Sequence, residues 1–267
     1  MSWRGASLLP SRVRRGVVIS GRDAVWHPMS IRQQKLQGDQ GGTGMDGPEL
    51  VIFDMAGTTV EDLGKVPDAF TAALAEHGVN VTREQLNGVR GASKRQAVLH
   101  FIPAGPEQAG RAEAAYTSFR THLSRRFQSE GVRPVAGAGL VFRSLRERGV
   151  RVALNTGFDR ETTGQLIGAL GWAEGMVDAI VCGDDVAEGR PAPYLIFRAM
   201  EATGASSVHR VANVGDTVLD LRAGYNAGVR WNIGVLTGAH HRQLLESVPH
   251  THLLPSVAEL PSLWAAA

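Results

Sequence analysis

Short runs of β-branched and aliphatic residues, separated by segments of helical character, recur from Met45 onward and constrain the fold of this chain most strongly. The first run is Leu50-Val51-Ile52-Phe53, which stops at Asp54. Four more lie at 150–154, 176–182, 208–214 and 229–236. Strands that alternate with helices favour a parallel sheet covered by helices on both faces. The sequence therefore predicts an α/β fold with a Rossmann-like, doubly wound parallel sheet, in which ligands bind beyond the carboxyl ends of the strands.

The segment between the first two predicted strands is far longer than the single crossover helix that a β-α-β unit needs. Four stretches in it have helical character, with Gly78, Gly91, Gly105 and Gly131 as breaks between or after them. These stretches lie at 67–77, 83–89, 94–101 and 107–129. We therefore expect residues 64–132 to form an inserted helical cap, and residues 45–63 and 133–267 to form the core.

Composition excludes several classes of protein. With 43% hydrophobic residues, a chain of 267 residues can bury a sizeable core, so it is not a disordered or fibrous protein. The single cysteine, Cys182, rules out an intrachain disulfide framework and a cysteine-based zinc site, and we expect it to be a buried core thiol. No apolar run approaches the roughly 18 residues of a membrane span. A cytoplasmic protein that binds neither membrane nor nucleic acid fits best.

The first 44 residues differ from the rest in charge. They hold seven Arg and Lys residues against Asp23 and Asp39, a net charge of +5, which leaves −3 for residues 45–267. An Arg-rich, acid-poor segment is compatible with a nucleic-acid arm or a transit peptide. The segment ends in a Gly-rich linker composition, however, and Met45 follows it directly. We interpret residues 1–44 as a disordered or mis-assigned leader that the folded protein does not need.

Polar motifs follow the predicted strands at the points where they end. Asp54-Met55-Ala56-Gly57-Thr58-Thr59 follows the first strand, Asn155-Thr156-Gly157 the second, and Gly215-Asp216-Thr217-Val218-Leu219-Asp220 the fourth. Gly189-Arg190-Pro191 lies before that fourth strand. Asp54 and Asp216 can hold Mg²⁺ as hard oxygen ligands, Thr156 and Gly157 can bind phosphoryl oxygens, and Arg190 can neutralise charge. A carboxylate beside Mg²⁺ and a phosphoryl group is a nucleophile for phosphorus.

Each motif taken alone has an ordinary structural explanation. A single Asp at the end of a strand often caps a helix, Thr-Gly is a common turn, and an isolated Arg is usually a surface residue. The ordered occurrence of all four motifs, each at the place where a ligand would bind, favours a shared active site instead.

These four motifs resemble those of the haloacid dehalogenase superfamily, and the resemblance covers nearly everything from Met45 onward. Most phosphatases and mutases of that superfamily carry Asp-x-Asp in the first motif, where the second Asp is the general acid and base, and Lys in the third. Here Ala56 and Arg190 occupy those positions. Both departures match the branch of phosphonoacetaldehyde hydrolase (phosphonatase) and its phosphonatase-like relatives. A carbon–phosphorus bond has no bridging oxygen to protonate, so it needs an electron sink on carbon rather than an acid.

That sink, by resemblance, is an iminium between the substrate aldehyde and a cap lysine. Gly91-Ala92-Ser93-Lys94 matches the Gly-x-x-Lys segment that carries this lysine in the family. Ser93 is predicted to be an N-cap with Gln96 as its capping-box partner, which places Lys94 in the first turn of a helix. The helix dipole, Arg95 and a nearby Mg²⁺ are expected to lower the pKa of the Lys94 amine. The alternative is that Lys94 is merely exposed or binds phosphate.

Three positions depart from phosphonatase itself, which has Cys, His and Tyr where this chain has Gly64, Ala97 and Phe158. These departures favour the phosphonatase-like branch and leave open whether the phosphonoaldehyde is plain or hydroxylated. The resemblance implies a catalytic pair of Asp54 and Lys94 and Mg²⁺ held by Asp54, the Ala56 carbonyl and Asp216. It also implies phosphoryl binding by Thr156, Gly157 and Arg190, with Asp220 orienting Arg190 or the metal shell.

The sequence thus predicts an Mg²⁺-dependent hydrolase of phosphonate catabolism that acts through a Lys Schiff base and an aspartyl-phosphate. Family resemblance also suggests a homodimer joined through the cap. Two other functions stay open: a phosphomonoesterase or phosphomutase of the same superfamily acting on a small phosphate ester, against which Ala56 counts, and a catalytically silent scaffold, against which the intact carboxylates count.

Overall fold

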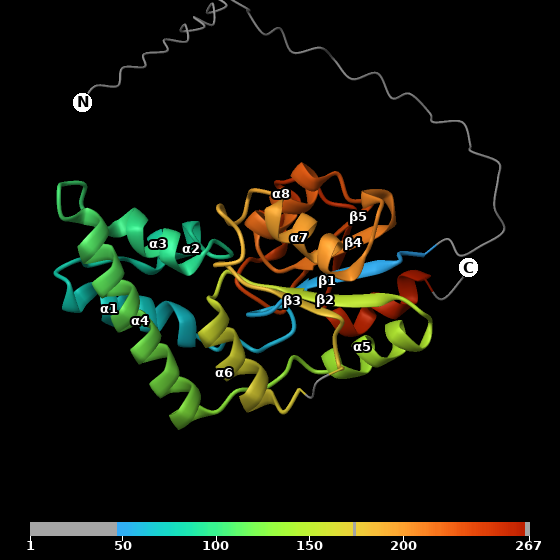
Figure 1. Ribbon diagram of the computed structural model, residues 1–267, viewed down its shortest axis with the longest axis horizontal. Coiled ribbons are helices and arrows are strands. Elements are labelled where there is room, and N and C mark those ends of the chain that lie inside the picture. The colour runs from blue at the N-terminus through green and yellow to red at the C-terminus, as the bar shows by residue number, and fades with distance from the viewer. Residues whose placement is uncertain (1–46, 173–174, 265–267) are drawn as a thin grey trace, which may run out of the picture. The chain divides into compact units, whose positions relative to one another are not determined.

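A parallel sheet of six strands forms the centre of the part of the chain that the computed structural model describes, residues 47–172 and 175–264 (Figure 1). The strands run in the order β3-β2-β1-β4-β5-β6, and every neighbouring pair is parallel. They are β1 (Leu50–Asp54), β2 (Arg151–Asn155), β3 (Ala179–Val181), β4 (Val211–Gly215), β5 (Trp231–Val235) and β6 (His252–Leu254). This is the doubly wound order that the sequence predicts, with its switch point between β1 and β4.

All five residues of β1 are buried because helices cover both faces of the sheet. Leu50 and Ile52 pack on one face with α7 (Tyr194–Thr203) and α8 (Val218–Ala227). Val51 and Phe53 pack on the other face with α5 (Ala138–Glu147) and α6 (Arg160–Leu170). Two further helical segments complete the core, α9 (Arg242–Glu246) and a 3₁₀ helix at Val257–Trp264.

The five predicted strands form, but some are shorter than expected. The run at 176–182 yields only Ala179–Val181, and the start of the run at 208–214 is a 3₁₀ turn, Val208–Arg210. The sixth strand, β6, was not predicted from the sequence. It has three residues, all only partly buried. The strand is formed by pairing with β5, and no local sequence pattern indicates it.

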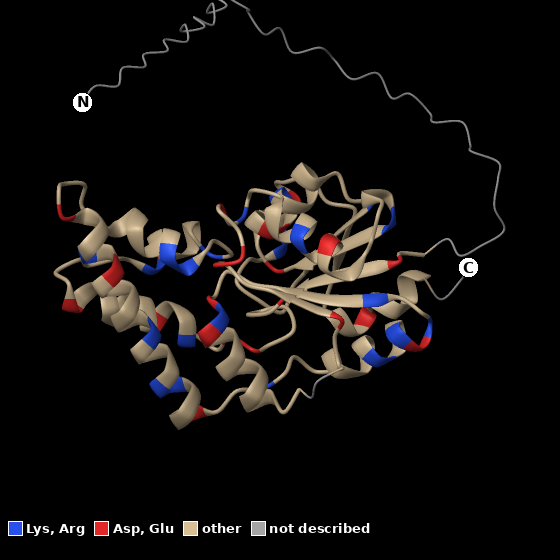
Figure 2. Ribbon diagram, in the orientation of Figure 1, with Lys and Arg blue, Asp and Glu red and all other residues tan. Residues whose placement is uncertain are grey.

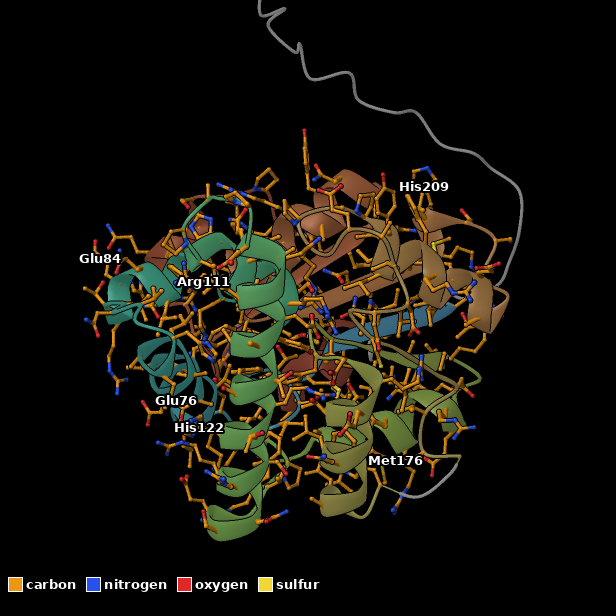
Figure 3. The ribbon with its side chains drawn as sticks, turned by 60° about the vertical axis from the view of Figure 1, so that its left-hand side comes forward. Glu76, Glu84, Arg111, His122, Met176 and His209 are labelled. Atoms are coloured by element: carbon orange, nitrogen blue, oxygen red, sulfur yellow. The ribbon has the colours of Figure 1, made fainter. Side chains whose placement is uncertain are left out.

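Five helices lie in sequence between β1 and β2, and we refer to the first four as the cap. They are α1 (Lys65–Glu76), α2 (Arg83–Gly88), α3 (Lys94–Phe101) and α4 (Gln108–Glu130), close to the expected bounds. The two long helices, α1 and α4, pack against each other through Phe70 and Phe119, whose ring centroids are 4.3 Å apart. His122 also contacts Glu76 at 2.8 Å across the same pair of helices (Figure 3). The domain limits proposed for the cap, 64–132, stay a prediction.

Charge is spread over the described helices rather than gathered by sign, since Lys and Arg alternate with Asp and Glu over both cap and core in the view of Figure 2. None of the described helices has the length and hydropathy that a membrane span requires. The predicted leader, residues 1–44, lies outside the described residues.

Candidate active site at the carboxyl ends of the strands

Asp54 ends β1 and begins a tight turn. The hydroxyl of Thr59 donates to the Asp54 carbonyl at 2.9 Å, and the Gly57 N–H donates to the Val60 carbonyl at 2.7 Å. Gly57 has a φ of +93°, and a Cβ there would lie 2.4 Å from Oδ2 of Asp216. The first motif therefore needs glycine at this position both for the backbone conformation and for its close approach to the fourth motif.

Three carboxylates, those of Asp54, Asp216 and Asp220, converge behind this turn. One ligating oxygen from each lies within 4.8 Å of the other two, and all three residues are buried. Burial raises the pKa of Asp216, and the negative charges of Asp54 and Asp220 raise it further. Burial likewise raises the pKa of Asp220, against the opposing charge of Arg190. Such mutual repulsion is what a bound cation relieves.

The residues present fit a divalent cation. Carboxylate oxygens are the ligands that Mg²⁺ takes in proteins, usually with water and substrate oxygens completing the shell. Oxygens of Asp216 accept hydrogen bonds from the Thr58 hydroxyl at 2.9 Å and from the Ala239 N–H at 2.7 Å, which hold this carboxylate in place. A Cβ at Gly238 would lie 2.0 Å from Oδ2 of Asp216, so the backbone forms a close cradle around that oxygen.

Arg190 lies between two of the carboxylates. Its guanidinium is 2.7 Å from Oδ1 of Asp54 and 2.9 Å from Oδ1 of Asp220, and its side chain is only 2% exposed. It also donates to the carbonyls of Asn155 at 3.1 Å and Gly91 at 3.2 Å. Arg190 thus links the nucleophile candidate, the second strand end and the cap, a network that the sequence motif alone did not reveal.

Thr156 and Gly157 lie at one of the places where the cap meets the core. The Thr156 hydroxyl accepts from the Phe158 N–H at 3.2 Å, and the Gly157 carbonyl accepts from the Lys94 N–H at 2.8 Å. A Cβ at Gly157 would lie 2.2 Å from the Ala92 carbonyl oxygen. The glycine of the second motif is therefore required for the cap loop to approach the strand end.

Lys94 is the first residue of α3, as predicted, but the predicted capping box is wrong. The Ser93 side chain makes no capping hydrogen bond, and the Gln96 side chain accepts from the Gly189 N–H at 3.3 Å instead. The core supplies these partners, since the first backbone N–H of α3 binds the Gly157 carbonyl. A local capping motif was thus overridden by contacts across the interface between cap and core.

The Lys94 side chain is buried, and its amine donates to the Ala92 carbonyl at 3.3 Å and lies 4.9 Å from the centre of the Phe158 ring. Burial lowers the pKa of Lys94 to about 8; Asp54 opposes the shift, and Arg190 and Arg90 add to it. The lowered pKa agrees with the sequence expectation, but burial is its largest cause. Arg95 is exposed and pairs with Glu113 of α4.

A cavity of about 30 Å³ brings these groups together, with Asp54, Ala56, Thr156 and Lys94 in its lining. A water molecule needs about 10–15 Å³ by such a measure, so the cavity is narrow. Asp62 and Arg90 line the cavity as well, and the sequence analysis did not predict them. They form a partly buried ion pair at 2.5 Å. The two residues lie 28 positions apart in the sequence, and no motif joins them.

The sheet order and the carboxylate cluster at the strand ends define the class of this protein. Residues 51–233 match the family described as haloacid dehalogenase-like hydrolase, and the chain belongs to this family, in the branch that contains the phosphonoacetaldehyde hydrolases.

Two relatives in sequence are named phosphonoacetaldehyde hydrolases. The chain is 31% identical over 211 residues to "Phosphonoacetaldehyde hydrolase" of Bacillus cereus, which covers 74% of this chain and 79% of the relative. It is 30% identical over 212 residues to the protein of the same name in Parabacteroides distasonis, covering 73% and 79%. A solved structure of a phosphonoacetaldehyde hydrolase-like protein from Oleispira antarctica shares the fold, with a TM-score of 0.72, 21% identity, and coverage of 86% of this chain and 96% of that one.

Proposed function

We propose that the protein hydrolyses the carbon–phosphorus bond of phosphonoacetaldehyde or a closely related 2-oxoalkylphosphonate. The observation that carries this proposal is the amine of Lys94, buried in a cavity that Asp54 also lines. A lysine with a pKa of about 8 is neutral for an appreciable fraction of the time near neutral pH, as attack on an aldehyde requires. The names of the relatives in sequence support the same substrate class.

The reaction begins with addition of the Lys94 amine to the substrate carbonyl, and loss of water gives an iminium. The Asp54 carboxylate then attacks phosphorus, and the electrons of the breaking carbon–phosphorus bond move into the iminium to form an enamine. Protonation of the enamine carbon and hydrolysis of the resulting iminium release the aldehyde product and free Lys94. Attack by a second water on the aspartyl-phosphate releases inorganic phosphate and restores Asp54.

The remaining residues bind and orient in this scheme. Thr156, Gly157 and Arg190 contact phosphoryl oxygens, and Asp220 holds the Arg190 guanidinium, to which it is already paired. Asp54, Asp216 and the Ala56 carbonyl would hold Mg²⁺, which when bound offsets the negative charge of the phosphoryl group and of Asp54. With Ala at position 56, no side chain there can protonate the leaving group, and an enamine leaving group does not need such an acid.

Family resemblance supports a homodimer joined through the cap and a place in phosphonate catabolism. The single cysteine of the chain, which rules out an intrachain disulfide framework, supports a cytoplasmic location.

A direct substrate comparison tests the proposal. The purified protein with Mg²⁺ is assayed for phosphate release from phosphonoacetaldehyde and from a panel of sugar phosphates and other small phosphate esters, with Asp54→Asn as the inactive control. We expect phosphate release from the phosphonoaldehyde and little from the esters. Turnover of a phosphate ester, together with no turnover of the phosphonoaldehyde, would instead support the phosphomonoesterase hypothesis.

A further inference from the structure

A carboxylate outside the reacting groups joins the cap to the core. Helix α4 of the cap and helix α6 of the core lie side by side (Figures 1 and 3), and Asp159 is the N-cap of α6. Its Oδ1 accepts from the Thr162 N–H at 2.8 Å, within the core. Its Oδ2 accepts from the Tyr116 hydroxyl at 2.8 Å and from Arg120 at 3.3 Å, both on α4. One carboxylate therefore holds both helices.

The hydrogen bond between Tyr116 and Asp159 is shielded from water and assisted by charge. Tyr116 is 2% exposed and Asp159 is 8% exposed. Burial raises the pKa of the Tyr116 hydroxyl, and the charge of Asp159 raises it further, so the hydroxyl stays a donor. Burial acts to raise the pKa of Asp159, but hydrogen bonds from Thr162 and Tyr116 and the charge of Arg120 outweigh it and lower that pKa. Hydrogen bonds to ionised acceptors are about twice as strong as neutral ones.

The two residues of this hydrogen bond are connected to the surroundings of Lys94 in both the core and the cap. Asp159 follows Phe158, whose ring the Lys94 amine faces at 4.9 Å. The guanidinium of Arg95, the residue after Lys94, lies over the Tyr116 ring at 4.6 Å. The contact of Lys94 with Phe158 and the contact of Tyr116 with Asp159 are thus neighbours in the cap and in the core.

We propose that Tyr116 and Asp159 form a clasp that holds the cap against the core and controls access to the Lys94 amine. The cavity around Lys94 has a volume of about 30 Å³, room for two or three water molecules at about 10–15 Å³ each, and a phosphonate with its hydration is larger. Substrate therefore reaches Lys94 only when the cap moves away from the core, and that movement breaks the clasp. The clasp does not depend on what Lys94 does chemically.

Lysine acetylation measures the opening without any substrate. An N-hydroxysuccinimide ester of acetic acid is uncharged and too large for the cavity, so it labels Lys94 only through the open state. The chain has three lysines, Lys35, Lys65 and Lys94, so each labelled peptide is assigned by mass spectrometry. Lys65 is an internal reference because it is also buried and lies on α1, away from the clasp. The matched variants are Tyr116→Phe, which removes one hydroxyl, and Tyr225→Phe, which removes an exposed one.

Tyr116→Phe should raise the labelling rate of Lys94 about tenfold at constant pH, because loss of one charge-assisted hydrogen bond increases the open population by about that factor. The rate at Lys65 should stay constant, and Tyr225→Phe should change neither. Equal rates at Lys94 in Tyr116→Phe and in the unaltered protein would refute the clasp, as would a parallel rise at Lys65, which indicates general loosening. If Tyr116→Phe fails to fold, Asp159→Asn tests the clasp instead. Asn still caps α6 but has no negative charge to hold the Tyr116 hydroxyl. The labelling rate of Lys94 must therefore rise in Asp159→Asn as well.

Discussion

An alanine at position 91 should weaken docking of the cap without unfolding it. Gly91 has a φ of +89°, and a Cβ there would lie 2.3 Å from Oγ1 of Thr217, in the fourth motif. That hydroxyl is held in place by the capping box of α8, accepting from the Asp220 N–H at 3.2 Å. Gly78 is a matched control because it also has a positive φ, +75°, with nothing within 4 Å of its would-be Cβ.

The two substitutions share the free-energy cost of an unfavourable backbone conformation, and only Gly91→Ala adds the cost of a steric overlap. Alanine at positive φ costs about 1–2 kcal/mol at either position. Overlap with a neighbour that cannot move adds about 1–3 kcal/mol at Gly91 alone. Moving the cap off the core relieves this overlap, so the extra cost falls on the docked, reactive arrangement rather than on folding. A cost of about 1–3 kcal/mol corresponds to a loss of about 5- to 150-fold in kcat/KM.

The assay compares kcat/KM for phosphonoacetaldehyde with the free energy of unfolding in urea. Gly91→Ala and Gly78→Ala should lose similar stability, about 1–2 kcal/mol each. Only Gly91→Ala should lose most of its activity. Equal activity in the two variants would show that the close approach of Gly91 to Thr217 is not needed for catalysis, and would refute the reasoning.

Three further outcomes follow from the site. Asp54→Asn should lower kcat by at least about three orders of magnitude, roughly 4 kcal/mol, and excess chelator should abolish turnover of the unaltered protein; substantial phosphate release in either steady-state assay would contradict the nucleophile and metal roles. Because burial lowers the pKa of Lys94 from 10.5 to about 8, the rate of imine formation should rise with pH up to about 8 and then level off, and a rate still rising at higher pH would point to an unperturbed amine. The same shift means that the unfolded chain holds the Lys94 proton between these two values, so the cost of burying this lysine fades as pH rises through that window. Ala56→Asp should gain weak phosphate-ester hydrolysis, measured as phosphate release, while phosphonoaldehyde cleavage falls; no gain with esters would remove the explanation offered for Ala56.

The sheet and the placement of the carboxylates could be predicted from the sequence because both depend on short-range patterns. A buried apolar run that stops at a polar motif marks a strand end, and parallel strands bring such ends to one edge. Asp54, Thr156 and Asp216 were located in this way. Asp62 and Arg90, which line the same cavity, were not, because a partly buried ion pair between loops that are far apart in the sequence leaves no periodic signal.

Contacts between the cap and the core account for the other differences. Ser93 and Gln96 have the spacing of a capping box, but the Gly157 carbonyl and the Gly189 N–H offer partners that only the folded chain brings near. Within the core, the pairing of Arg190 with Asp220 agrees with the orienting role that the resemblance implied, whereas its pairing with Asp54 was not expected and depends on tertiary structure. Local patterns therefore identified the groups, and long-range packing determined their partners.

Borohydride trapping tests most directly whether the Lys94 amine forms an imine with the substrate. Borohydride added with phosphonoacetaldehyde should inactivate the protein and leave a reduced adduct on the peptide that contains Lys94, while borohydride alone should do nothing. Three lysines in the chain make the assignment simple.

Two charge-conserving variants complete the measurement. Lys94→Arg keeps the positive charge but cannot form an imine, because guanidinium stays protonated, so it should bind substrate without cleaving it. Lys65→Arg is the matched control, since Lys65 is also buried and pairs with Glu130 at 3.8 Å, and it should keep full activity and full trapping. An active Lys94→Arg variant and no adduct on the Lys94 peptide of the unaltered protein would contradict the account and leave phosphate binding as the role of this lysine.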